Sequence, residues 1–160
     1  MKKISVLLLF LLTMLFSGIS QNSLVTLNQS IDSWHKAAAD ADSDIFFNFM
    51  DSSCVYIGTD ASERWSKKEF FQFAKPYFDR GKAWDFKAYD RIIYFADDGR
   101  TAWFDELLNT WMGICRGSGV AEYKNGMWKL QHYHLSVSVP NEKIHEFIKL
   151  LSPAPEVNKE

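Results

Sequence analysis

Apolar residues recur every three or four positions in the first half of the chain, a spacing that places them on one face of an α-helix. A first helix is predicted from about residue 22, and its apolar face consists of Leu24, Leu27, Ile31, Trp34 and Ala38. Asp40 to Asp44 interrupts this pattern, and a short second helix is predicted around residues 45–49. A third helix begins at Ser66, where Ser66 and Glu69 form a capping box, and it ends at Gly81.

The second half of the chain changes to runs typical of β-strands. Strands are predicted at residues 54–58, 84–95, 101–110, 115–123 and 127–139, and a short C-terminal helix is predicted after Pro140. Asn125-Gly126 predicts a tight hairpin, because both central residues of a type I′ turn need positive φ. Helices followed by a run of antiparallel strands predict an α+β fold, with about three N-terminal helices on one face of a curved antiparallel sheet.

The N-terminus has the pattern of a secretory signal peptide at residues 1–20. Met-Lys-Lys is followed by an apolar run from Ile4 to Phe16 and then by small residues. The run is shorter than the ~20 residues of a membrane span, so we expect cleavage, export to the periplasm or the exterior, and no stable membrane anchor. One domain is expected at residues 21–151, followed by a disordered tail at 152–160.

The amino-acid composition limits which kinds of partner the chain is expected to bind. Without Lys2 and Lys3 the chain has 16 Lys and Arg against 20 Asp and Glu, and this mildly acidic balance argues against a nucleic-acid partner. Thirteen Phe and six Trp are more than one small core easily buries, so some should line a cavity or an interface. Cys54 and Cys115 could form a disulfide after export, but the sequence does not fix the distance between them.

The two hairpins suggest a pocket. With a two-residue turn at Asn125-Gly126, Gly119 faces His132 and Gly117 faces His134, which leaves open volume above the two imidazoles. We expect these histidines on one face with Trp128 and Leu130, and Asp105 on the same face with Trp103. A bulge in the first hairpin would reverse the assignment and place Glu106 inside.

Five segments in order resemble the SnoaL-like domains of the nuclear transport factor 2-like superfamily. They are Trp34-His-Lys-Ala-Ala-Ala-Asp40, Ile57-Gly-Thr-Asp60 with Glu63-Arg-Trp65, Ala102-Trp-Phe-Asp-Glu106, Arg116-Gly-Ser-Gly-Val120, and Trp128 to Ser136 with Pro140-Asn141. The resemblance spans about residues 28–142. It implies a cone-shaped sheet with a pocket against the helices, and often a homodimer formed through the outer sheet face. It does not fix the chemistry, because the family includes isomerases, cyclases, dehydratases and members without known activity.

Acid–base chemistry is the first functional hypothesis. A carboxylate in an apolar pocket holds its proton more tightly than in water, and a nearby histidine opposes that effect, so such a pair can move a proton. Asp105 is the predicted base, His134 its partner or the acid, and His132 a further candidate. The predicted walls around a small, largely apolar molecule are Trp34, Tyr56, Trp65 and Trp103.

The second hypothesis is a module that uses the same pocket to bind a ligand or a partner without turnover. His132 and His134 could contribute two metal ligands, but no third histidine is placed to complete a site, and no signature identifies a cofactor. We therefore expect neither a metal site nor a cofactor.

The outer sheet face is predicted to carry an apolar surface through which two copies of the chain form a homodimer. This surface is made of Ile93, Phe95, Phe104, Val120, Tyr133, Leu135 and Val137.

Overall fold

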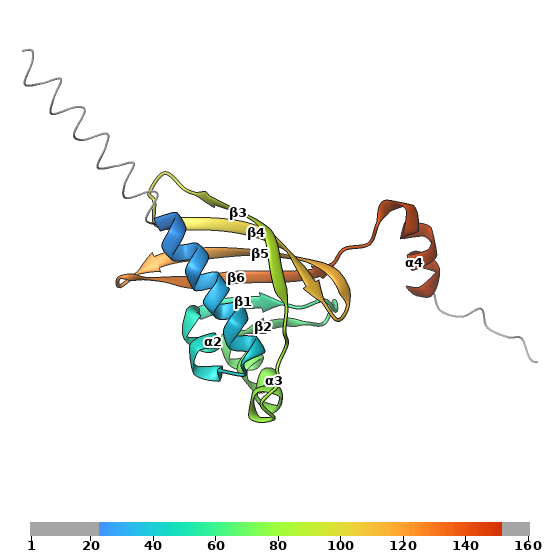
Figure 1. Cartoon of the computed structure of the whole chain (residues 1–160), viewed down its shortest axis with the longest axis horizontal. Coiled ribbons are helices and arrows are strands. Elements are labelled where there is room, and N and C mark those ends of the chain that lie inside the picture. The colour runs from blue at the N-terminus through green and yellow to red at the C-terminus, as the bar shows by residue number, and fades with distance from the viewer. Residues whose placement is uncertain (1–22, 152–160) are drawn as a thin grey trace, which may run out of the picture.

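A computed structural model describes residues 23–151, and the predicted signal peptide and C-terminal tail lie outside them. Helices cover one face of a six-stranded sheet whose strand order is β2-β1-β6-β5-β4-β3 (Figure 1). The N-terminal helix is described at residues 23–39. It is followed by α2 (Ser43–Phe49), β1 (Met50–Ile57), β2 (Arg64–Ser66), α3 (Lys67–Asp79), β3 (Lys87–Phe95), β4 (Thr101–Thr110), β5 (Gly113–Lys124), β6 (Met127–Val137), η1 (Asn141–Lys143) and α4 (Ile144–Leu151).

The predicted α+β fold is confirmed, with one difference in strand direction. β1 pairs with β6 in parallel, whereas the other neighbouring strands are antiparallel, so the sheet is mixed. The predicted capping box begins α3: the backbone N–H of Ser66 donates to Glu69 Oε2 at 2.8 Å, and the backbone N–H of Glu69 donates to Ser66 Oγ at 3.4 Å. Among the described helices, none is long and apolar enough to cross a membrane.

The core lies between the helices and the inner face of the sheet. The N-terminal helix contributes Leu27, Ile31 and Trp34, and the sheet contributes residues such as Phe104 and Leu108. Cys54 and Cys115 are both buried and free, so no disulfide joins them. Burial raises the pKa of the Cys54 thiol to about 12, which keeps it protonated and unreactive.

The β5–β6 hairpin follows the predicted register only near its turn. Asn125 and Gly126 have φ of 51° and 83°, and Lys124 faces Met127. A bulge then interrupts the pairing: Ala121 faces Leu130, but Val120 faces His132, so Gln131 is the extra residue. Side chains beyond it change faces. The expectation that His132 and His134 lie with Trp128 on the inner face is therefore wrong, and Tyr133 and Leu135 point inward instead.

The glycines of β5 make room for aromatic rings, not for a cavity. Gly119 faces Tyr133 and Gly117 faces Leu135, one position away from the predicted pairs. A Cβ on Gly117 would lie 2.0 Å from the Tyr133 hydroxyl oxygen, and one on Gly119 would lie 2.6 Å from Phe104 Cζ. The close approach of these rings explains why the strand carries glycine at both positions.

The β3–β4 hairpin has the predicted residue pairs, but the side chains expected on its inner face lie on its outer face. Tyr94 faces Trp103 and Ile92 faces Asp105, as predicted. Turn geometry determines which residues pair, but it does not determine which face of the hairpin the helices cover. Glu106 points inward with 0% exposure, and Trp103 lies on the outer face with 47% exposure. The alternative with Glu106 inside is therefore the correct one.

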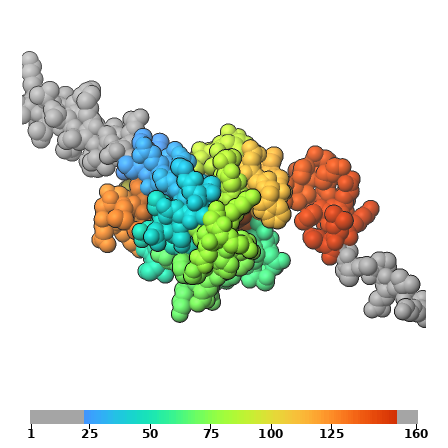
Figure 2. Space-filling view, turned by 60° about the horizontal axis from the view of Figure 1, so that its bottom comes forward, coloured from blue at the N-terminus to red at the C-terminus, as the bar shows by residue number. Residues whose placement is uncertain are grey.

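The surface predicted to form a dimer is also corrected. Phe104, Tyr133 and Leu135 are buried beneath the helices of their own chain. The large hydrophobic side chains that are exposed on β3 and β4 are Ile92, Tyr94 and Trp103. At the other end of the molecule α4 stands apart from the sheet (Figure 2), and none of its residues is buried.

Candidate functional site

A cavity of about 210 Å³ opens between α3, the β1–β2 hairpin and the segment that leads into β3. We call it the aromatic cavity. It is lined by Tyr56, Gly58, Thr59, Glu63, Trp65, Phe70, Phe73, Tyr77, Ala83, Trp84, Phe86, Trp111, Met112 and Leu135. The rings pack in parallel pairs, with centroids 4.7 Å apart for Trp65 and Phe73 and 3.9 Å apart for Tyr56 and Phe70. Such walls fit the face of a flat, apolar molecule.

Glu63 and Tyr56 are two of the polar side chains that line the aromatic cavity. Glu63 folds back over Gly58, because its Oε2 accepts a hydrogen bond from the backbone N–H of Asp60 at 3.2 Å and leaves no space for a Cβ at Gly58. The Tyr56 hydroxyl has no partner among the described residues. Burial and the nearby Glu63 raise the pKa of Tyr56, so its hydroxyl stays neutral and can donate to a ligand.

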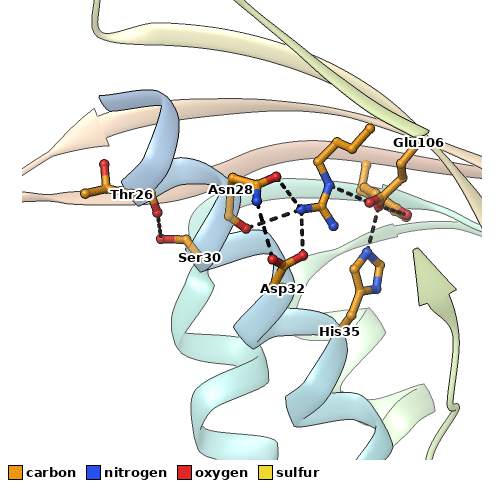
Figure 3. A network of polar contacts seen from close by, with 8 residues as sticks. Thr26, Asn28, Ser30, Asp32, His35 and Glu106 are labelled. Carbon is orange, nitrogen blue, oxygen red and sulfur yellow. Dashed lines mark hydrogen bonds and ion pairs between the residues drawn. The ribbon is translucent and has the colours of Figure 1, made fainter. Parts of the chain in front are cut away.

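Behind the cavity, a buried network surrounds Glu106 (Figure 3). Glu106 Oε1 lies 2.6 Å from His35 Nε2 and accepts a hydrogen bond from the Tyr133 hydroxyl at 3.0 Å. Arg91 Nε donates to Glu106 Oε2 at 2.7 Å. Arg91 Nη1 donates to Asp32 Oδ1 at 2.7 Å and to Asn28 Oδ1 at 2.8 Å. The network therefore ties the N-terminal helix to β3, β4 and β6.

Glu106 is held in its ionised form. Burial by itself would raise the pKa of the carboxyl group, but the hydrogen bond from His35, together with the positive charges of His35 and Arg91, outweighs burial and places the pKa below its ordinary value of 4.5. The same environment raises the pKa of Tyr133 well above 10.0, through burial and the negative charge of Glu106. Tyr133 is therefore a neutral donor to an ionised acceptor.

Acid is expected to weaken the fold through Glu106. Because the folded pKa is depressed, the carboxylate stabilises the fold at pH values above 4.5 and loses this effect as the pH falls through the folded pKa. Urea unfolding of the wild type should show a free energy of unfolding that declines below that pH more steeply than in Glu106→Gln, which has no carboxyl group to protonate. Equal declines in the two proteins would contradict this role.

The structure brings two of the four predicted wall residues to the aromatic cavity. Tyr56 and Trp65 line it. Trp34 is instead part of the core, stacked on Phe46 at 5.1 Å. Trp103 lies on the outer sheet face, stacked on Tyr94 at 5.9 Å. The two errors follow from helix packing and from the reversed face of β4, respectively.

The three predicted acid–base residues lie on the outer face of the sheet. Asp105 accepts from Arg116 Nη1 at 2.5 Å, and His134 Nε2 lies 3.2 Å from Ser136 Oγ. Ser118 separates Asp105 from His134 in the strand register. Burial lowers the pKa of His132, with a smaller effect from His134. The structure does not bring these residues to the aromatic cavity, so the predicted placement is wrong.

Sequence reasoning missed His35 and the role of Arg91. His35 is buried against Glu106. A signal was present, because His35 lies four residues after Ile31 and three before Ala38 on the face of the helix that packs against the sheet. Within residues 23–151, no three His, Cys, Asp or Glu side chains gather as metal ligands would.

The model of one protein family, described as the SnoaL-like domain, matches residues 27–140 of this chain. No curated protein matches it by sequence. An "NTF2-like protein of unknown function" from Pseudomonas putida KT2440 is 16% identical, with a TM-score of 0.60 and coverage of 73% of this chain and 87% of that one.

Two further solved structures share the fold. A "putative scytalone dehydratase" from Novosphingobium aromaticivorans is 7% identical, with a TM-score of 0.64 and coverage of 77% of this chain and 89% of that one. A "putative Ca/calmodulin-dependent kinase II association domain" from Exiguobacterium sibiricum is 12% identical, with a TM-score of 0.54 and coverage of 73% and 94%. At these identities the likeness shows the fold alone.

Proposed function

The chain belongs to the SnoaL-like domain family, and on that premise we propose that it binds a small, flat, largely apolar molecule in the aromatic cavity. The observation that carries the proposal is the wall of that cavity, where Trp65, Phe73 and Trp84 are only partly covered by the chain's own atoms. A ligand that covers exposed aromatic surface of this kind removes apolar area from water, and this contributes favourably to the free energy of binding. The unpaired Tyr56 hydroxyl supplies one directional hydrogen bond to a polar group of the ligand.

Binding without turnover suits the aromatic cavity better than acid–base chemistry. Glu106 does not line this cavity, and both of its oxygens already accept from His35, Tyr133 and Arg91. Glu63 is the single acidic residue in the lining, and no histidine accompanies it. A neighbouring fold bears the name of a dehydratase, but an identity of 7% carries no catalytic residue to this chain.

Titration with 2-naphthol, a flat aromatic with one hydroxyl group, tests the proposal by isothermal calorimetry. The wild type should bind it, and Trp65→Ala should bind it about 10-fold more weakly or worse, because a large part of the stacking surface is removed. Trp103→Ala is the matched control, since that indole lies on the outer face, and it should bind like the wild type. Absence of binding by the wild type, or equal weakening in both variants, would reject the aromatic cavity as the site.

We also propose that two copies of the chain associate through the outer sheet face. Ile92, Tyr94 and Trp103 form an exposed apolar surface there, with exposures of 51%, 47% and 47%. An apolar surface of this kind on a sheet marks an interaction site. A neighbouring fold is named an association domain, which agrees with the use of this fold for assembly.

Sedimentation equilibrium should give the mass of a dimer for the wild type and of a monomer for Trp103→Glu, because a charge within the apolar surface would have to be desolvated in the interface. Ile45→Glu places the same charge on α2, at a residue of similar exposure away from the sheet face, and should remain dimeric. A monomeric wild type at micromolar concentration would refute the association.

A further inference from the structure

Two histidines of β6 extend the apolar surface that Ile92, Tyr94 and Trp103 form on the outer sheet face. Paired residues of neighbouring strands direct their side chains to the same face. One row of pairs runs across the sheet through Tyr94, Trp103, Val120, His132 and Val55, and the next through Ile92, Asp105, Ser118, His134 and Ile57. Only β5 lies between β4 and β6 (Figure 1), so the backbones at Trp103 and His132 are about 10 Å apart.

The apolar surface by itself is too small for a stable association. A specific interface buries about 800 Å² on each partner, whereas a whole aromatic side chain buries about 150–250 Å², and the three side chains here are only about half exposed. Because β3 is an edge strand, an interface on this sheet can grow from Trp103 only toward β5 and β6. The half-buried Val120 and Val55 supply further apolar area on either side of His132.

Two-fold symmetry would bring the histidines of both copies into the same interface. In a symmetric dimer each copy contributes the same patch of its surface. A patch that reaches from Trp103 across β5 includes His132, which is half-buried in the single chain, and His134, which is exposed. Four imidazoles would therefore lose water when two copies associate.

The carboxylates that surround this part of the face are already paired with cations. The charged residues of the neighbouring positions on β1, β2, β4, β5 and β6 are Asp51, Arg64, Asp105, Arg116, Glu122, Lys124 and Lys129. Arg116 Nη1 lies 2.5 Å from Asp105 Oδ1. Lys124 Nζ lies 2.8 Å from Glu122 Oε2 and 3.6 Å from Asp51 Oδ2. A proton on either imidazole would find no free carboxylate among these groups.

The nearest unpaired charge is a cation. Arg64 on β2 faces Ile57, the residue that also faces His134, and within residues 23–151 it has no ion pair. Burial lowers the pKa of His132 below its ordinary value of 6.5, and the positive charges of His134 and Arg64 lower this pKa further. Removal of the remaining water in an interface would lower it again, because desolvation disfavours the charged form.

We propose that His132 and His134 make association through the outer sheet face dependent on pH: two copies associate while these imidazoles are neutral and separate when they are protonated. This switch rests on the association proposed above and adds its regulation. The dimer binds fewer protons than two separate chains, so association is at full strength above the pKa of the separate chains, which for His132 lies below 6.5. It weakens as the pH falls from there through the lower pKa of the dimer.

Sedimentation equilibrium at about pH 7.5 and about pH 5, on either side of the ordinary histidine pKa, tests the switch. The dissociation constant of the wild type should be about 10-fold higher or more at the lower pH. That pH still lies above 4.5, below which protonation of Glu106 is expected to weaken the fold, and circular dichroism checks that the chain stays folded. EDTA in both buffers excludes a metal ion held between histidines of two copies as the cause.

The variant that carries both His132→Gln and His134→Gln should have the same dissociation constant at the two pH values, because glutamine does not titrate. His145→Gln is the matched control, since it removes an exposed histidine on α4, away from the sheet. This control should keep the pH dependence of the wild type.

A count of protons gives a second readout that needs no variant. Dilution of the wild type in a calorimeter at about pH 6, in buffers of different ionisation enthalpy, should show that dissociation takes up protons. Equal dissociation constants at the two pH values, dissociation without proton uptake, or a double variant with the wild-type pH dependence would each overturn the switch and leave the dimer in place. A wild type that is monomeric at about pH 7.5 would refute the association and the switch with it.

Discussion

Glu106→Ala is expected to lower the free energy of unfolding by about 3–5 kcal/mol, the usual cost of removing one partner from a buried ion pair. The reason is the number of donors that lose their acceptor. His35 Nε2, the Tyr133 hydroxyl and Arg91 Nε all donate to this one carboxylate, which has 0% exposure. Water cannot replace the acceptor without entering the core. The buried charge of Arg91 would then be balanced only by its ion pair with Asp32. Urea unfolding followed by circular dichroism measures the loss.

Asp105→Ala is the matched control, since Asp105 precedes Glu106 in the same strand and is also ion-paired. Its partner is Arg116, and the two side chains are 35% and 54% exposed. Exposed pairs contribute about 0–1 kcal/mol, because water solvates both charges in the absence of the partner. Similar losses in the two variants would show that the network around Glu106 does not stabilise the fold in the way its geometry indicates.

Gly117→Ala is expected to cost about 1–3 kcal/mol, although it adds a single methyl group. The new Cβ would lie 2.0 Å from the Tyr133 hydroxyl oxygen and 2.7 Å from Tyr133 Cζ. The ring has little freedom to withdraw, because it packs edge-on against Trp34 at 4.8 Å and its hydroxyl donates to Glu106. Displacement of the ring would also weaken that hydrogen bond.

Ser118→Ala provides the comparison for Gly117→Ala, because residue 118 lies on the opposite face of the same strand. It should change the free energy of unfolding by less than about 0.5 kcal/mol, as surface substitutions usually do. Thermal or urea unfolding of both variants measures the difference. A Gly117→Ala protein as stable as Ser118→Ala would mean that Tyr133 moves without cost.

Local sequence signals predicted most elements of this fold and its β5–β6 turn, but not the short strand β2. Asn125-Gly126 gave the β5–β6 turn because few residues accept positive φ, and Ser66 with Glu69 gave the start of α3 because each side chain satisfies a backbone group of the other. These signals are contained within a few consecutive residues. The parallel pairing of β1 with β6 joins distant segments, and no local pattern announced it.

The site was harder to predict, because a change of one residue in register moves every later side chain to the other face. The bulge at Gln131 has no glycine or proline to mark it, and it carries His132 and His134 outward. For Asp105 and Glu106 the pairing was correct, but the buried face depends on where the helices dock. Tyr56 and Trp65 were placed correctly at the cavity, because they lie on a short hairpin beside α3.

Ligand binding in the aromatic cavity can be tested directly by the response of the tryptophan indole signals to 2-naphthol. The chain has six tryptophans. Trp65, Trp84 and Trp111 line the cavity, and Trp103 lies on the outer sheet face. In a ¹H–¹⁵N spectrum assigned by single Trp→Phe variants, we expect saturable shifts of the three cavity indoles and an unchanged Trp103 signal. Shifts confined to Trp103, or none at saturating 2-naphthol, would contradict it.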